Sequence, residues 1–109
     1  MTCDAWDVVT VPFPFTDHSG QKRRPALVLS PRRFNAEGHS VMAMITTKRH
    51  SPWPGDVEIA HLAAAGLRTA CIVRVKIFTL DNRLIVRRIG AVAAADKKAI
   101  RTSLRQQLW

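Results

Sequence analysis

Three cations lead directly into an apolar run in the stretch Lys22-Arg23-Arg24-Pro25-Ala26-Leu27-Val28-Leu29-Ser30-Pro31. The residues after Arg24 are continuously apolar, which is typical of a strand covered on both faces. We therefore expect a central strand with fixed positive charge at its N-terminal end. Guanidinium groups suit phosphate because they stay ionised and offer forked donors, and a strand holds such a group more firmly than a loop does. Nucleic acid is accordingly the first partner to consider.

The chain as a whole is basic. It has 17 Lys and Arg against 8 Asp and Glu, a formal net charge of +9 over 109 residues. This balance fits a nucleic-acid-binding domain, and a merely soluble basic protein is the alternative. The length predicts one domain over residues 1–109, with a modest core that dimerisation would enlarge. No apolar run approaches the roughly 18 residues of a membrane span, and the acidic N-terminus is unlike a secretory signal, so we expect a cytoplasmic protein.

The residues that usually bind metals are dispersed. Cys3 and Cys71 stand far apart, and the four histidines are scattered without metal-ligand spacing. The carboxylates are also spread along the chain, whereas a two-metal nuclease needs several that converge. We expect no metal or other cofactor, and free thiols in a reducing cytoplasm.

Six segments are predicted to be strands from their β-branched or alternating apolar residues. They are residues 7–13, 24–30, 41–47, 56–59, 70–78 and 84–92. A long polar loop over 14–23 makes the first two a hairpin, and an alanine-rich helical turn over 60–65 ends at Gly66. In the fifth strand, alternation places Arg74 and Lys76 on one face, and that face is predicted to be charged while the other is core.

The C-terminal segment changes period. Ile100, Leu104 and Leu108 recur every four residues and Asp96 lies in the first turn, which predicts an amphipathic helix from Ala94 onward. Short strands, long loops and one closing helix favour a small, mostly antiparallel β-barrel, because curling removes exposed edges. A ferredoxin-like sandwich fits less well, since only one helix is convincing.

Several segments resemble, in the same order and at compatible spacing, toxins of the MazF/PemK family, the endoribonuclease half of a type II toxin–antitoxin pair. They are residues 7–17, Arg24-Pro25-Ala26 and on to Pro31, Ile45-Thr46-Thr47, Trp53-Pro54-Gly55-Asp56-Val57, Val73-Arg74 and residues 78–84. The resemblance covers essentially the whole chain. It implies an SH3-like barrel with a C-terminal helix, usually a homodimer, that cuts single-stranded RNA without a metal and inhibits growth or translation. It also implies a cognate antitoxin protein that holds the toxin inactive.

The resemblance assigns roles to four residues. The arginine of the Arg-Pro-Ala motif corresponds to Arg24, and the catalytic threonine after the third strand corresponds to Thr46. Some members also use an arginine at the position of Arg74 and a histidine in the first loop, where His18 stands here. Because the family's pattern places an acid two residues after that arginine in some members, Lys76 is a departure.

A second departure lies before the first strand. A glycine usually precedes the first acid of that strand, and Trp6 occupies this position. We therefore expect an altered turn there, with the indole near the surface.

RNA carries its own nucleophile in the 2′-hydroxyl, so cleavage needs alignment, proton transfer and stabilisation of charge on phosphorus. Arginine, with a pKa above about 12, is poorly matched to proton transfer near neutrality, so we assign Arg24 mainly to charge stabilisation. Thr46 can donate one hydrogen bond to the same phosphate. His18 titrates near neutral pH and is the candidate base, although loop histidines are more often simply solvated.

The remaining candidates are contacts to RNA. Lys22, Arg23, Lys48 and Lys76 are expected to bind phosphates, and Trp53 to stack on a base or to pack at the core rim or dimer interface. Two other functions stay open: a non-catalytic barrel that binds nucleic acid, and a gyrase-inhibiting toxin of the same fold. In the latter, the pair of Arg24 and Thr46 would have no purpose.

Overall fold

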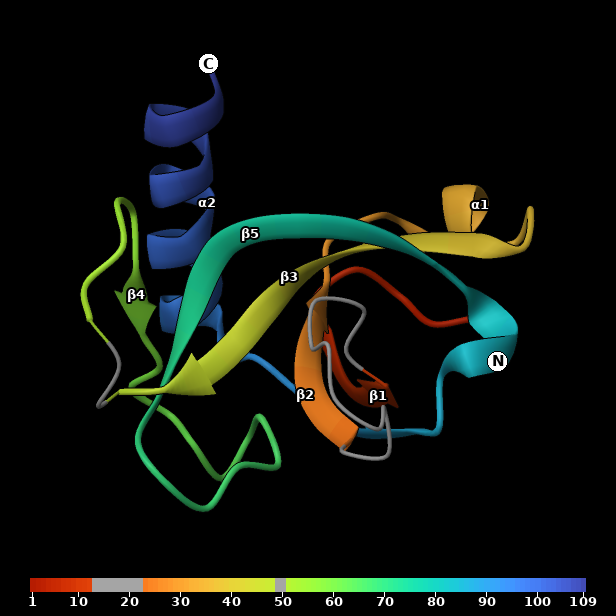
Figure 1. The fold of residues 1–109 in the computed structure, drawn as a ribbon, viewed down its shortest axis with the longest axis horizontal. Helices are drawn as coiled ribbons and strands as arrows, with labels where there is room; N and C mark the ends of the chain where they lie inside the picture. The colour runs from red at the N-terminus through yellow and green to blue at the C-terminus, as the bar shows by residue number, and fades with distance from the viewer. Residues whose placement is uncertain (13–22, 49–50) are drawn as a thin grey trace.

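The computed structural model describes residues 1–12, 23–48 and 51–109. Figure 1 shows a strongly curled sheet with one long helix standing at its end beside β4 and β5. The strands pair in the order β4-β5-β3-β2-β1-β6, and every pair is antiparallel. The elements are β1 Asp7–Pro12, β2 Arg23–Val28, α1 Arg32–Asn35, β3 His39–Thr47, β4 Val57–Glu58, β5 Cys71–Asp81, η1 Asn82–Leu84, β6 Arg87–Ala91 and α2 Ala94–Leu108. The predicted fold, a mostly β, SH3-like antiparallel barrel with a C-terminal helix, is confirmed in a partly open form.

The strand predictions hold in order and type. The β1–β2 hairpin and the interior position of β2 are both confirmed. Strands β3 and β5 are longer than predicted, because they pair from His39 opposite Asp81 to Thr47 opposite Cys71. Residues 13–22, which include the predicted loop with His18 and Lys22, lie outside the described residues.

The alanine-rich segment forms the predicted short turn ended by Gly66: the Gly66 N–H donates to the Ala63 carbonyl at 3.0 Å and the Leu67 N–H to the Leu62 carbonyl at 2.9 Å. Gly66 has φ +73°, and a Cβ there would lie 2.1 Å from the Ile89 carbonyl oxygen, so the turn packs directly on β6. The last strand begins at Arg87 instead of residue 84, because the Asp81 carboxylate accepts the Arg83 N–H at 2.8 Å and caps the short helix η1.

Two apolar clusters lie on opposite faces of the sheet, because neighbouring side chains alternate along each strand. Cluster 1 fills the inner side and contains Cys3, Val9, Val11, Ala26, Val28, Met42, Phe78, Leu80 and Ile85. Cluster 2 packs under α2 and contains Val8, Leu27, Ala43, Ile45, Ile59, Ala65, Cys71, Val73, Val92 and Ile100. Ile100 is 1% exposed, which confirms the predicted apolar face of the helix, whereas Leu108 near its end is exposed.

Asp96 anchors α2 to the turn that precedes β5. It is buried, and its two carboxylate oxygens accept the backbone N–H groups of Ala60 and His61, each at 2.9 Å. The sequence predicts an acid in this first helical turn, but the contact of Asp96 with another part of the chain emerges only in the fold.

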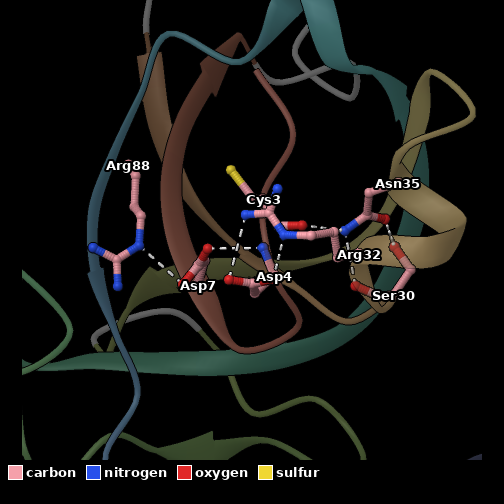
Figure 2. Close-up of polar contacts among 7 residues, drawn as sticks. All are labelled: Cys3, Asp4, Asp7, Ser30, Arg32, Asn35 and Arg88. Atoms are coloured by element: carbon pink, nitrogen blue, oxygen red, sulfur yellow. Dashed lines mark hydrogen bonds and ion pairs between the residues drawn. The ribbon is translucent and has the colours of Figure 1, made fainter.

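The N-terminal segment is tied to the sheet by charged and amide side chains (Figure 2). The buried Asp7 carboxylate accepts the Asp4 N–H at 2.9 Å and pairs with Arg88 Nε at 2.9 Å. Nearby, Asn35 is fully buried and donates to the carbonyls of Cys3 at 2.8 Å and Ser30 at 2.9 Å. Burial raises the pKa of the Cys3 thiol, and the Asp7 carboxylate adds to that effect.

Trp6 adopts the left-handed backbone conformation that glycine favours, with φ +76°. Its N–H donates to the Val28 carbonyl at 2.7 Å, and its carbonyl accepts the Val92 N–H at 3.1 Å. The turn before β1 therefore places a tryptophan in a backbone conformation that glycine adopts more readily. The indole is half-buried against cluster 2, with Lys97 Nζ 5.5 Å from its ring centre.

Candidate active site

The register of three adjacent strands brings Arg24, Thr46 and Arg74 to one face of the sheet. Ala26 of β2 lies opposite Met44 of β3, and Met44 lies opposite Arg74 of β5. Arg24 is two residues before Ala26, and Thr46 is two residues after Met44, so alternation gives them the same face. This is also the face of cluster 1, against which Met44 packs. The three polar residues thus lie on the same face as cluster 1, near the C-terminal end of β3.

Arg24 carries a buried donor without a partner among the described residues. The residue is half-buried, and its Nε is buried without a hydrogen-bond partner in the part of the chain that the structure describes. Buried polar groups are nearly always paired, and an unpaired donor carries a free-energy cost. The neighbouring candidate Thr46 is 5% exposed, and its hydroxyl offers one donor. Together they offer hydrogen-bond donors to an anion.

Arg74 is held by an acid that the sequence reasoning missed. Its Nε donates to Asp56 Oδ1 at 3.1 Å, its Nη2 donates to Asp56 Oδ2 at 3.0 Å, and Nη2 also donates to the Ser51 carbonyl at 2.8 Å. Arg74 is 8% exposed, so the expectation of a charged outer face on β5 is wrong at this residue. The signal that pointed to Asp56 was its place in the Trp-Pro-Gly-Asp-Val motif. The two partners are 18 positions apart in the sequence, so a local pattern does not reveal the pairing.

The loop before β4 carries Trp53 against this pair. Its indole Nε1 donates to the Val75 carbonyl at 3.2 Å, and its ring centre lies 5.4 Å from Arg74 Cζ and 5.8 Å from Lys76 Nζ. The residue remains 41% exposed. Two expected RNA contacts, Trp53 and Lys76, therefore lie side by side.

The same loop is also fastened to α2. The Ser103 hydroxyl donates to the Gly55 carbonyl. Gly55 has φ +82°, and a Cβ there would lie 2.6 Å from Cγ of Gln107. Helix α2 consequently backs the loop that carries Trp53.

The other predicted contacts lie at the periphery. Arg23 is exposed and opposite Pro12, and Lys48 Nζ pairs with Glu58 at 2.7 Å between two side chains that are more than half exposed. Exposed pairs of this kind contribute little and are screened by salt. His18 and Lys22 fall outside the described ranges. Over residues 1–12, 23–48 and 51–109, three or more His, Cys, Asp or Glu side chains nowhere gather as a metal site would require, and no helix is long and apolar enough to cross a membrane.

On the opposite face of the sheet, an apolar groove of about 780 Å³ runs along α2. Its lining includes Trp6, Leu29, Ile77, Leu104 and Leu108, with the basic side chains of Arg101 and Arg105. The sheet therefore separates this groove from Arg24 and Thr46.

Comparison with solved structures places the fold among known toxins. An endoribonuclease bound to its cognate antitoxin, from a mycobacterial species, superposes with a TM-score of 0.76 over 97% of this chain and 94% of that chain, at 20% identity. One form of the MazE–MazF complex of Deinococcus radiodurans gives a TM-score of 0.77 at 28% identity, over 99% of this chain and 97% of that chain. The Mycobacterium tuberculosis toxin MazF-mt6 gives 0.73 at 20% identity, over 92% and 93%. The matches at 20% identity establish similarity of fold alone.

A direct search of curated proteins finds no match. The family model described as the PemK-like, MazF-like toxin of type II toxin–antitoxin systems matches residues 4–108. Because this match spans nearly the entire sequence, the chain belongs to the PemK-like, MazF-like toxin family.

Proposed function

We propose that this protein is a metal-independent endoribonuclease that cuts single-stranded RNA at selected sequences and acts as the toxin of a type II toxin–antitoxin pair. The observation that carries the proposal is the buried Nε of Arg24, which has no partner within the described residues and shares a face with Thr46. A phosphodiester supplies the charged acceptor that such a donor requires. Family membership and the endoribonuclease named among the solved structures support the reaction class.

In the proposed reaction, the 2′-oxygen attacks the adjacent phosphorus while the bond from phosphorus to the 5′-oxygen breaks. The leaving 5′-oxygen takes up a proton from water, and the products are a 2′,3′-cyclic phosphate and a free 5′-hydroxyl. Arg24 stabilises the negative charge that builds up on the phosphate oxygens, and Thr46 donates a further hydrogen bond. His18 is the proposed base for the 2′-hydroxyl proton. Arg74, held by Asp56, contributes fixed positive charge near the phosphate instead of moving a proton.

RNA lies, in this proposal, across the strand ends that carry Arg24 and Thr46. Lys22, Arg23, Lys48 and Lys76 contact its phosphates, and Trp53 stacks on a base. Sequence choice then depends on how the loop containing Trp53 accepts particular bases. A cytoplasmic location follows from an mRNA substrate.

Two protein partners complete the proposal. A cognate antitoxin is supported by the Deinococcus radiodurans MazE–MazF complex and by the mycobacterial endoribonuclease bound to its antitoxin. A second copy of this chain is the proposed occupant of the groove along α2, because Leu108 is 52% and Trp109 88% exposed at its end. Burial of these side chains in a homodimer would enlarge the modest core of a small chain.

Cleavage in excess EDTA tests the enzyme. We expect the purified protein to cut single-stranded RNA and leave a cyclic phosphate, and Arg24→Ala to lower the rate on the order of a hundredfold or more. Arg33→Ala is the matched control, because it removes an exposed cation from α1, which lies at the far end of the sheet from α2 (Figure 1). Retarded but intact RNA would favour the nucleic-acid-binding barrel. Intact, unbound RNA together with inhibited gyrase would favour the other toxin class.

Light scattering during gel filtration tests the dimer. The wild-type chain is expected to elute as a dimer, and Leu108→Asp to shift it toward the monomer, because a carboxylate would be buried in the interface. A wild-type monomer at high protein concentration would contradict this assignment of the groove.

A further inference from the structure

Asp56 joins the loop before β4 to strand β5. Its Oδ1 accepts Arg74 Nε at 3.1 Å, and its Oδ2 accepts both Arg74 Nη2 at 3.0 Å and the backbone N–H of Trp53 at 3.0 Å. The side chains of Arg74 and Asp56 are only 10% and 16% exposed. A single carboxylate, largely shielded from water, therefore fixes the guanidinium and folds the loop over it.

This arrangement determines where the Trp53 indole lies. The Arg74 guanidinium and the Lys76 ammonium are both within cation–π distance of its ring, and the Val75 carbonyl holds its Nε1. The indole is thus held at its polar edge and by two cations, while 41% of the residue remains exposed. An aromatic ring fixed before a ligand arrives loses little freedom on binding, which favours affinity.

The held indole lies beside Arg74, one of the candidate catalytic residues. Arg74 is opposite Met44, and Thr46 is two residues further along β3 on the same face. We propose that Asp56 is a positioning residue: by holding Arg74 and the loop, it presents Trp53 as a preformed platform on which one base next to the scissile phosphate stacks. This inference rests on the proposed ribonuclease activity and names the part of that site that binds a base.

A platform of this kind acts on substrate affinity more than on the chemical step. Base–aromatic stacking contributes about fivefold to a hundredfold in affinity. Asp56→Asn keeps the size of the side chain but replaces one acceptor by an amide donor facing N–H groups. We therefore expect it to raise KM by about that factor and, because it also loosens Arg74, to lower kcat as well. Trp53→Ala should give a similar increase in KM with kcat close to the wild-type value, and the double variant should raise KM little more than either single one.

The experiment measures kcat and KM for cleavage of one single-stranded RNA by the wild type, Asp56→Asn, Trp53→Ala and the double variant. Asp81→Asn is the matched control, because it breaks another aspartate–arginine pair at the opposite end of β5. Additive effects, an unchanged KM in Trp53→Ala, or a loss confined to kcat in Asp56→Asn would overturn the inference. Trp53→Ala leaves the pair of Asp56 and Arg74 in place, so the platform is tested even if Asp56→Asn fails to fold.

Binding separates this inference from the proposed function. The same RNA with 2′-deoxy nucleotides cannot be cut, and its dissociation constant is measured by fluorescence anisotropy of a labelled strand, with quenching of tryptophan fluorescence recorded alongside. Quenching that disappears in Trp53→Ala and weakens in Asp56→Asn supports the platform even if the wild type cuts no RNA. Equal affinity of all variants for this RNA would overturn it even if cleavage occurs.

Discussion

Replacement of Arg24 by methionine should move stability and activity in opposite directions. Methionine keeps an unbranched stem beside Val11 on the neighbouring strand and removes the guanidinium. The Nε of Arg24 is buried and unpaired among the described residues, and an unsatisfied buried donor costs about 1–3 kcal/mol. Arg24→Met removes that cost, so we expect the free energy of unfolding to rise by up to about this amount.

The effect on cleavage has the opposite sign. Loss of one donor to a developing oxyanion lowers the rate by about 10²–10³-fold, or roughly 2.7–4 kcal/mol of transition-state stabilisation. A residue retained for function is expected to show such a trade-off, whereas an arginine that served only the fold would lose stability on replacement.

Urea unfolding followed by circular dichroism gives the first quantity, and single-turnover cleavage of RNA gives the second. Arg33→Met, an exposed cation on α1, should leave both unchanged. A lower urea midpoint for Arg24→Met with an unchanged slope would show that the Nε is paired in the folded protein. Cleavage within about tenfold of the wild type would refute the assigned role in charge stabilisation.

Three further outcomes follow from the fold. Asp96→Asn places an amide donor against one of two backbone N–H groups and should lower the free energy of unfolding by about 1–3 kcal/mol, measured in urea. Gly66→Ala should cost more than about 1 kcal/mol in thermal unfolding, since φ is +73° and the Ile89 carbonyl oxygen occupies the position. Hydrogen bonds from Arg83 lower the pKa of Asp81 to about 2 from 3.8. Because this folded-state pKa lies below the unfolded one, the stabilisation is complete above about pH 4 and is lost as the pH falls toward 2. Asp81→Asn should therefore show a smaller decrease in urea midpoint over that range, and an equal decrease would contradict the assignment.

The resemblance to the toxin family supplied the candidate pair of Arg24 and Thr46, and the alternation of side chains along strands accounts for their common face. Once β2 and β3 are recognised as neighbours, Arg24 and Thr46 share a face if the register is right, and the Ala26–Met44 pair supplies that register. The four-residue spacing of α2 was equally informative, because a helix that packs on a sheet needs a continuous apolar stripe, and Ile100 is buried accordingly.

Contacts between distant segments could not be predicted in this way. Arg74 is compatible with either a solvated strand face or a buried ion pair, and the choice depends on Asp56, 18 residues earlier. The four-residue helix α1 is too short to show a period, and its last residue, Asn35, is buried by its hydrogen bonds to Cys3 and Ser30. Such side chains are fixed by tertiary partners, which local patterns do not encode.

The hydrogen bond from the Ser103 hydroxyl to the Gly55 carbonyl affects how the native state opens locally. The second half of α2 backs the loop whose Ser51 carbonyl and Asp56 carboxylate hold Arg74, so the helix cannot detach without breaking its hydrogen bond to that loop. Segments that depend on one another in this way open as one cooperative unit. Amide protons of α2 and of residues 51–56 that are protected in the folded chain should then exchange with solvent deuterium at a common rate, as a single unit.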